Sequence, residues 1–125
     1  MKIITVTLAV AAALACSDSL APFQPEINNA ADNFQFQATA LKNVTTTVQY
    51  TWQNSGTAAT VNHSSAVTGG SATLTIKDAN GTAVYSGALV ASGTPATSTG
   101  VAGGWSIQVV LTGVSGTLNF RVQKV

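Results

Sequence analysis

The chain has 125 residues, a formal net charge of +1 and a charged fraction of only 7%, far below the roughly 25% of an average soluble protein. This length allows a single domain, and the low charge argues against nucleic-acid binding, which needs a basic surface. One cysteine and one histidine are too few for an internal disulfide or a cysteine–histidine zinc site.

The first sixteen residues have the layout of a secretion signal. Lys2 gives a positive start, and residues 3–15 carry no charge. Such a stretch has the length of a signal-peptide apolar region, whereas a helix that spans a bilayer takes about 20 residues. The stretch ends in small residues, which signal peptidase accepts before its cleavage site. We therefore predict that residues 1–15 are a signal peptide and that the mature chain is extracytoplasmic.

The end of this signal, Ala13-Leu14-Ala15-Cys16, resembles the lipobox of bacterial lipoproteins, in which the cysteine receives diacylglycerol and becomes the first mature residue. It departs from the preferred form, which has leucine three places before the cysteine and a small residue two places before it. The only cysteine of the chain nevertheless stands where the modification needs it. The resemblance implies that a lipidated Cys16, carrying palmitate-type acyl groups, attaches the protein to a membrane of the bacterial cell envelope.

Two alternatives concern where the mature chain resides. Ser17 stands where an aspartate would resemble an inner-membrane retention signal, so its presence favours the outer membrane. Ordinary secretion after Ala15 would instead leave a soluble protein. That protein would carry a free thiol, which is prone to bridging and oxidation in an oxidising compartment.

Residues 16–32 are predicted to be a lipid-anchored tether. They contain Pro22, Pro25 and the pair Asn28-Asn29, and they show no sustained hydrophobic period. Such a segment is typical of an extended linker. The alternative is a short strand near Phe23 that docks on the domain.

From residue 33 to the C-terminus, apolar and polar residues alternate with the period of two that marks half-buried strands. The alternating segments are residues 34–40, 44–53, 59–67, 72–76, 83–85, 105–111 and 118–122. Asn80-Gly81 is a strong hairpin signal, and the glycine-rich residues 92–104 indicate a loop or a short edge strand. We predict an all-β domain over residues 33–125. Its expected form is an antiparallel β-sandwich of about seven or eight strands, immunoglobulin-like or jelly-roll-like, with Trp52 and Trp105 in the core.

Two of these segments resemble the accessory β-sandwich modules of secreted bacterial proteins. Residues 71–76 with the Asn-Gly turn that follows, and residues 104–109, are similar to immunoglobulin-like modules and to the pre-peptidase C-terminal domain. The likeness lies in the pattern of strands and turns and includes no functional motif. It implies a role in adhesion, targeting or spacing and assigns no site residue.

Few side chains suit catalysis or metal binding. His63 is in phase with Val61 on a weak strand, so we expect a structural or surface histidine. Asp78 precedes the hairpin and is expected to cap that turn. No Gly-x-Ser-x-Gly elbow occurs, and the acids do not cluster as a calcium loop requires. We therefore predict that the protein is not an enzyme and holds neither a metal nor a cofactor.

The candidate ligand face comprises Thr47, Gln49 and Thr51, which alternate with apolar residues, together with Tyr85. We expect Tyr85 on the outer face because it follows Val84. A Thr/Gln face with an aromatic ring suits sugars, although strand propensity alone also favours threonine. The sequence thus predicts a small envelope lipoprotein with a non-catalytic binding or structural module. The alternatives are a carbohydrate-binding module and a secreted soluble sandwich; besides the membrane, the expected partner is a glycan or an envelope protein docked on an unpaired strand edge.

Overall fold

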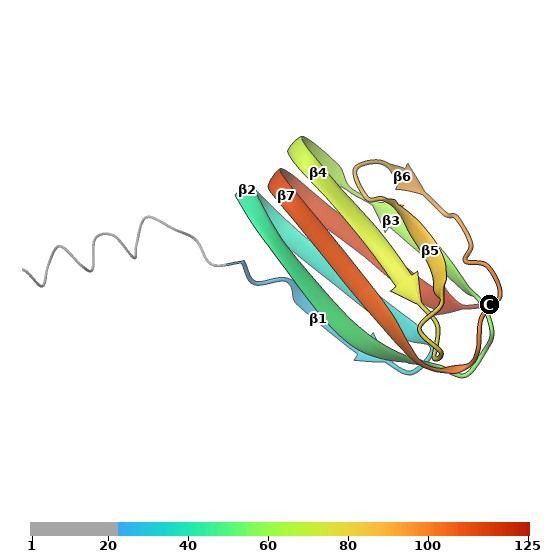
Figure 1. The fold of residues 1–125 in the computed structure, drawn as a ribbon. Coiled ribbons are helices and arrows are strands. Elements are labelled where there is room, and N and C mark those ends of the chain that lie inside the picture. Colours follow the sequence, from blue (N-terminus) through green and yellow to red (C-terminus); the bar gives the residue numbers. More distant parts are fainter. Residues whose placement is uncertain (1–22) are drawn as a thin grey trace, which may run out of the picture.

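The computed structural model describes residues 23–125, which form seven antiparallel β-strands (Figure 1). The strands are β1 (Glu26–Ala30), β2 (Asn33–Asn54), β3 (Ala59–Ser64), β4 (Ala66–Lys77), β5 (Ala83–Ala88), β6 (Ser92–Gly93) and β7 (Gly103–Lys124). The predicted antiparallel all-β domain is therefore confirmed. The predicted signal peptide and Cys16 lie outside the described residues.

Strand β7 is the centre of a single sheet. It pairs with β2 along the length of both strands, from Asn33 opposite Gln123 to Asn54 opposite Gly103. On its other edge β7 pairs with β3 and then with β4, while β1, β5 and β6 add to β2, β4 and β3 respectively. The seven strands belong to one sheet, so neither the predicted β-sandwich nor its immunoglobulin-like or jelly-roll-like strand order is confirmed by this arrangement.

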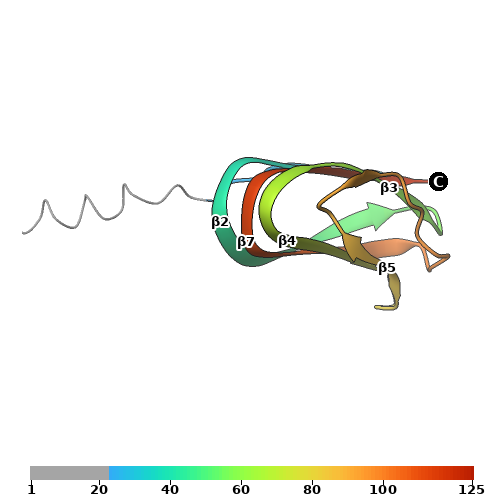
Figure 2. The same ribbon diagram turned by 90° about the horizontal axis from the view of Figure 1, so that it is seen from above.

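The long strands bend so that the two halves of the sheet face each other. Figure 2 shows β2, β7 and β4 turning through a U at one end of the domain. At the bend the pairing of β2 with β7 shifts register between Ala38 and Thr46, and that of β4 with β7 shifts between Val67 and Ser71. Three glycines with positive φ lie in the same region: Gly70, Gly113 and Gly116. Bulges and glycines of this kind sharpen the local twist and bend of a strand.

The bend explains why two continuous strands were each predicted as two separate strands. Residues 34–40 and 44–53 were predicted as separate strands, yet both belong to β2, and residues 105–111 and 118–122 both belong to β7. The interruption in alternation marks a bend within a continuous ladder and not a loop. The two-residue β6 matches the short edge strand considered for residues 92–104.

The core lies between the facing halves. Phe34, Phe36 and Phe120 come from one half, and their rings pack together, with the centroids of Phe36 and Phe120 5.0 Å apart. Trp52 and Trp105 come from the other half, are fully buried, and meet edge to face at 5.9 Å. Their placement in the core confirms the prediction for both tryptophans.

The tether prediction does not hold for residues 26–30. These residues form β1 and pair with residues 33–37 of β2 through a tight turn at Asp32. Ile27 and Phe23 are partly buried against the core, and the Phe23 ring lies 6.4 Å from that of Phe36. Burial of these apolar side chains draws the segment onto the sheet, as the alternative of a docked strand anticipated. Residues 16–22 of the predicted tether lie outside the described part.

Candidate functional site

The predicted residues of β2 belong to a larger polar surface that spans three adjacent strands. Thr47, Gln49 and Thr51 are exposed on the outer face of β2. Across the sheet they continue in three rows: Thr47–Val110–Thr73, Gln49–Gln108–Thr75 and Thr51–Ser106–Lys77. We call the polar members of these rows, Thr47, Gln49, Thr51, Thr73, Thr75, Lys77, Ser106 and Gln108, the Thr/Gln face.

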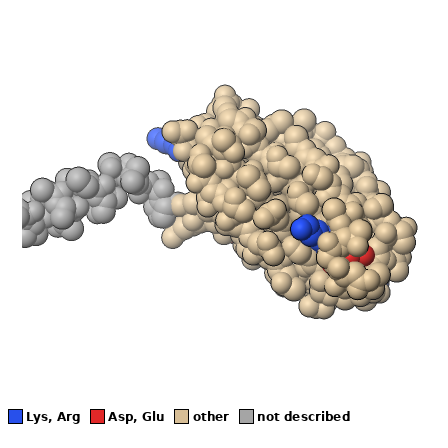
Figure 3. All heavy atoms as spheres, in the orientation of Figure 1, with Lys and Arg blue, Asp and Glu red and all other residues tan. Residues whose placement is uncertain are grey.

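The Thr/Gln face is flat, weakly charged and slightly hollowed. Its shallow hollow of about 190 Å³ is lined by Gln49, Thr75, Lys77, Gly81, Ser106 and Gln108. Figure 3, in which β2, β7 and β4 face the viewer, shows very little charge on this side of the domain. Amide groups both donate and accept hydrogen bonds, as hydroxyl groups do. The face can therefore form paired hydrogen bonds with a ligand rich in hydroxyl groups.

Sequence reasoning identified the β2 part of this face and missed the parts on β7 and β4. Ser106 and Gln108 alternate with the buried Trp105 and Ile107, so their outward orientation was available from the pattern. Which strands would lie side by side was not, because pairing between distant segments is set by the tertiary fold.

Tyr85 does not belong to the Thr/Gln face, contrary to the prediction. It pairs with the buried Ile76 and is itself partly buried against the core. A register shift between Ile76 and Lys77 lets Val84 and Tyr85 both turn toward the core, whereas strict alternation would place them on opposite faces. Burial raises the pKa of the Tyr85 hydroxyl above its ordinary value. The structure therefore separates the one predicted stacking ring from the polar residues.

Asp78 caps the β4–β5 hairpin, as predicted, and also fastens the loop before β7. Its Oδ1 accepts hydrogen bonds from the N–H groups of Asn80 at 3.0 Å and Thr82 at 2.9 Å. Its Oδ2 accepts a third bond from the N–H of Val101 at 2.9 Å. These bonds, that from Thr82 first, hold the pKa of the buried carboxyl below its ordinary value. The contact with Val101 was not foreseen because it joins residues 23 positions apart.

We expect acid to destabilise the domain through Asp78. Because its pKa is lower in the folded than in the unfolded chain, its contribution is fully present above the unfolded value of about 3.9. That contribution is lost as the pH falls toward the folded pKa. Thermal unfolding followed by circular dichroism should be measured at a series of pH values from about 7 to about 2.5. The midpoint temperature should decrease once the pH is below about 4.

Asp78→Asn should lower the midpoint at neutral pH and flatten this acid dependence, since the amide cannot titrate. Glu26→Gln is the control, because it removes an exposed carboxyl from the edge strand β1. An Asp78→Asn protein with the same acid profile as the parent would contradict this role.

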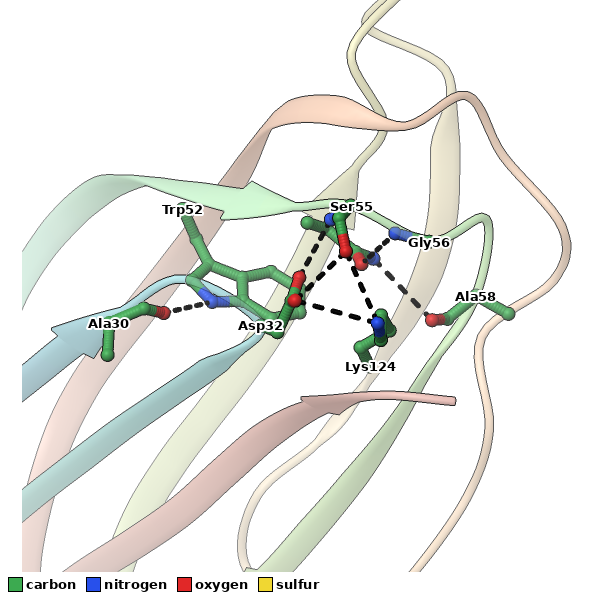
Figure 4. Close-up of polar contacts among 8 residues, drawn as sticks. Ala30, Asp32, Trp52, Ser55, Gly56, Ala58 and Lys124 are labelled. Carbon is green, nitrogen blue, oxygen red and sulfur yellow. Dashed lines mark hydrogen bonds and ion pairs between the residues drawn. The ribbon is translucent and has the colours of Figure 1, made fainter.

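Asp32, in the turn between β1 and β2, performs a similar structural task (Figure 4). Its carboxylate accepts hydrogen bonds from the Ser55 N–H at 2.7 Å and the Ser55 hydroxyl at 2.9 Å. The Lys124 ammonium lies 3.6 Å from Oδ2 of Asp32. The bonds from Ser55, ahead of the charge of Lys124, lower the pKa of Asp32. These groups join the β1–β2 turn to the end of β2 and to the end of β7.

His63 is almost fully buried, and its environment is structural. The side chain is 7% exposed, and Nδ1 lies 2.5 Å from the carbonyl oxygen of Ala91. Within residues 23–125, no three His, Cys, Asp or Glu side chains gather as a metal ion would need. The same stretch contains no helix with the length and apolarity to cross a bilayer.

One edge of β2 is open over the second half of the strand. Strand β1 covers only residues 33–37, and no other strand of the described chain pairs with residues 44–50 on that side. Where this edge ends, Asn29 Nδ2 donates a hydrogen bond to the carbonyl oxygen of Thr51. The Asp32 N–H donates one to the carbonyl oxygen of Gln53. The open residues are uncharged and mostly β-branched, so they offer the backbone groups that strand addition by a protein partner requires.

No protein-family model matches this chain. A comparison with curated proteins likewise finds no significantly similar sequence. Function therefore has to follow from the geometry and chemistry of the chain itself.

Proposed function

We propose that this protein is a small cell-envelope lipoprotein whose β domain is a non-catalytic binding module for polyhydroxylated ligands such as surface glycans. The Thr/Gln face is the observation that supports this role. It presents amide and hydroxyl groups from three neighbouring strands around a hollow of about 190 Å³. The sheet is bent so that its halves enclose a common core, which is consistent with the proposed likeness to accessory β-sandwich modules.

Two of the acids and the histidine are engaged in holding the fold. Asp78 and Asp32 accept several hydrogen bonds each, and His63 is buried beside Ala91. The amides and hydroxyls of the Thr/Gln face are by contrast exposed or half-buried, and the Thr75 hydroxyl lies 3.5 Å from that of Ser86. With Tyr85 turned toward the core, the face binds through hydrogen bonds rather than ring stacking, so we expect weak affinity and a gain from multivalent ligands.

A glycan array tests this role. We expect the full chain to bind a subset of neutral glycans, and the double variant Gln49→Ala/Gln108→Ala to bind them about tenfold more weakly, because a tenfold loss corresponds to about one or two hydrogen bonds. Gln24→Ala is the matched control, since it removes an exposed glutamine outside the face. A blank array, or equal binding by the double variant, would rule out the glycan role.

The proposed anchor is tested separately by metabolic labelling with a palmitate analogue. The parent chain should take up the label and fractionate with membranes, because each buried methylene contributes about 0.8 kcal/mol and two acyl chains give stable attachment. Cys16→Ser should do neither. Recovery of the parent chain from the culture medium, processed but without lipid, would overturn the lipoprotein proposal and leave the binding proposal standing.

A further inference from the structure

The outer face of the other half of the sheet is rich in amides and centred on one cation. Arg121 in β7 lies directly opposite Gln35 in β2 and Asn62 in β3. Asn119, two residues earlier in β7, and Ser64, two residues later in β3, project to the same side because side chains alternate along a strand. Asn62, Ser64, Asn119 and Arg121 together line a hollow of about 140 Å³. We call these four residues the Arg121 hollow.

The charge of Arg121 has no counterpart in the described chain. The only ion pair among residues 23–125 joins Lys124 to Asp32. Glu26 lies on β1 and is separated from β7 by β2, where its partner is Gln37. Asp78 is occupied by backbone N–H groups in the other half of the sheet. Every direct cross-strand neighbour of Arg121 is thus a neutral hydrogen-bonding residue.

Arg121 is also incompletely satisfied as a donor. The side chain is partly buried, and its Nε is buried without a hydrogen-bond partner in the described part of the chain. Buried polar groups in folded proteins are normally paired, and an exception calls for an explanation. Burying part of a cation without an anion is costly. The buried Nε itself is closed to an external ligand, so an anion from outside would meet the part of the Arg121 side chain that lines the hollow and would offset the cost through its charge.

We propose that the Arg121 hollow binds the carboxylate of an acidic saccharide. The planar guanidinium matches a carboxylate through two parallel hydrogen bonds, which makes arginine well suited to this group. The amides of Asn62 and Asn119 and the hydroxyl of Ser64 can pair with the ring hydroxyls beside that carboxylate. This site is separate from the Thr/Gln face, and its ligand differs in charge.

Calorimetry on the full chain purified in detergent tests the proposal with two probes of equal length. We expect a galacturonic acid trisaccharide to bind at least tenfold more tightly than the neutral galactose trisaccharide. Arg121→Gln should abolish this preference, and Arg121→Lys should lose most of it because the ammonium cannot form the paired bonds. Lys42→Gln, which removes an exposed cation outside both the Thr/Gln face and the Arg121 hollow, is the matched control and should retain the preference.

A second measurement does not depend on the folding of any variant. Titration of the parent chain with the acidic trisaccharide should shift the backbone amide NMR signals of Asn62, Ser64 and Asn119, and leave those of Thr75 and Gln108 in place. Absence of binding, equal affinity for the two trisaccharides, or an equal loss in Lys42→Gln would overturn the proposal. If inorganic phosphate or acetate at the same concentration displaced the acidic trisaccharide, the hollow would be a site for simple anions, and the saccharide assignment would be overturned. The double variant Gln49→Ala/Gln108→Ala should retain the acidic preference, so failure of the two sites can be told apart.

Discussion

Trp105→Ala is expected to lower the free energy of unfolding by about 3–5 kcal/mol. Trp105 is fully buried, and its ring meets that of Trp52 at 5.9 Å. Its indole N–H donates to the carbonyl of Val101 at 2.7 Å. Truncation removes an aromatic surface of roughly 150–250 Å² and leaves a cavity beside the second tryptophan. Since domains are stable by only about 5–15 kcal/mol, much of the total would be lost.

Urea unfolding followed by far-ultraviolet circular dichroism measures this change without relying on tryptophan fluorescence. Trp105→Phe is the control that keeps a buried ring and removes the N–H donor. Its cost should be smaller, about 1–3 kcal/mol, because the cavity is smaller. A loss below about 1 kcal/mol in Trp105→Ala would mean that the core does not depend on this ring.

Gly70→Ala should lower the free energy of unfolding by about 4 kcal/mol or more, or prevent folding. Gly70 lies at the bend of β4 with φ of 80°, a conformation that residues with a side chain rarely adopt. A Cβ atom added there would lie only 2.1 Å from the carbonyl oxygen of Gly113 in the neighbouring strand. Because the obstacle is backbone, relief requires β4 and β7 to separate where the sheet turns over.

Gly69→Ala is the matched control for this position. Its added Cβ would meet no atom within 4 Å, and Gly69 is not among the residues with positive φ. The two variants have the same composition and differ by one position, so the same urea titration should give a change within about 1 kcal/mol for Gly69→Ala. Equal losses in the two variants would show that the bend does not require glycine at position 70.

Local alternation predicted the strands well but not their continuity. It assigned inward positions such as Phe34, Trp52 and Ile107 correctly, because each depends only on its immediate neighbours. The bend in β2 and β7 was interpreted as a break between strands, since bulges interrupt the period just as loops do. The first strand was considered only as an alternative to a tether, because Glu26–Ala30 lacks alternation and gains its structure from pairing with β2.

The polar faces were partly within reach of the sequence. Thr47, Gln49 and Thr51 follow directly from the pattern of β2, whereas the assignment of Tyr85 to the same face failed at a bulge. Arg121 was not singled out. Its alternation with Phe120 and Val122 indicates an outward position, but its neighbours Gln35 and Asn62 lie 86 and 59 positions away in the chain (121 − 35 and 121 − 62). Such juxtapositions are set by strand order, which no local period encodes.

The turning-over of the sheet has a mechanical consequence. β2 and β7 each run from one layer into the other, and β3 continues along β7 into β4. The two halves of the sheet are thus joined by continuous strands at the bend, so they cannot slide past each other as separate sheets could. Pulling one half away would break the backbone hydrogen bonds of the other half as well. The domain should therefore unfold under force as one cooperative unit, in a single step.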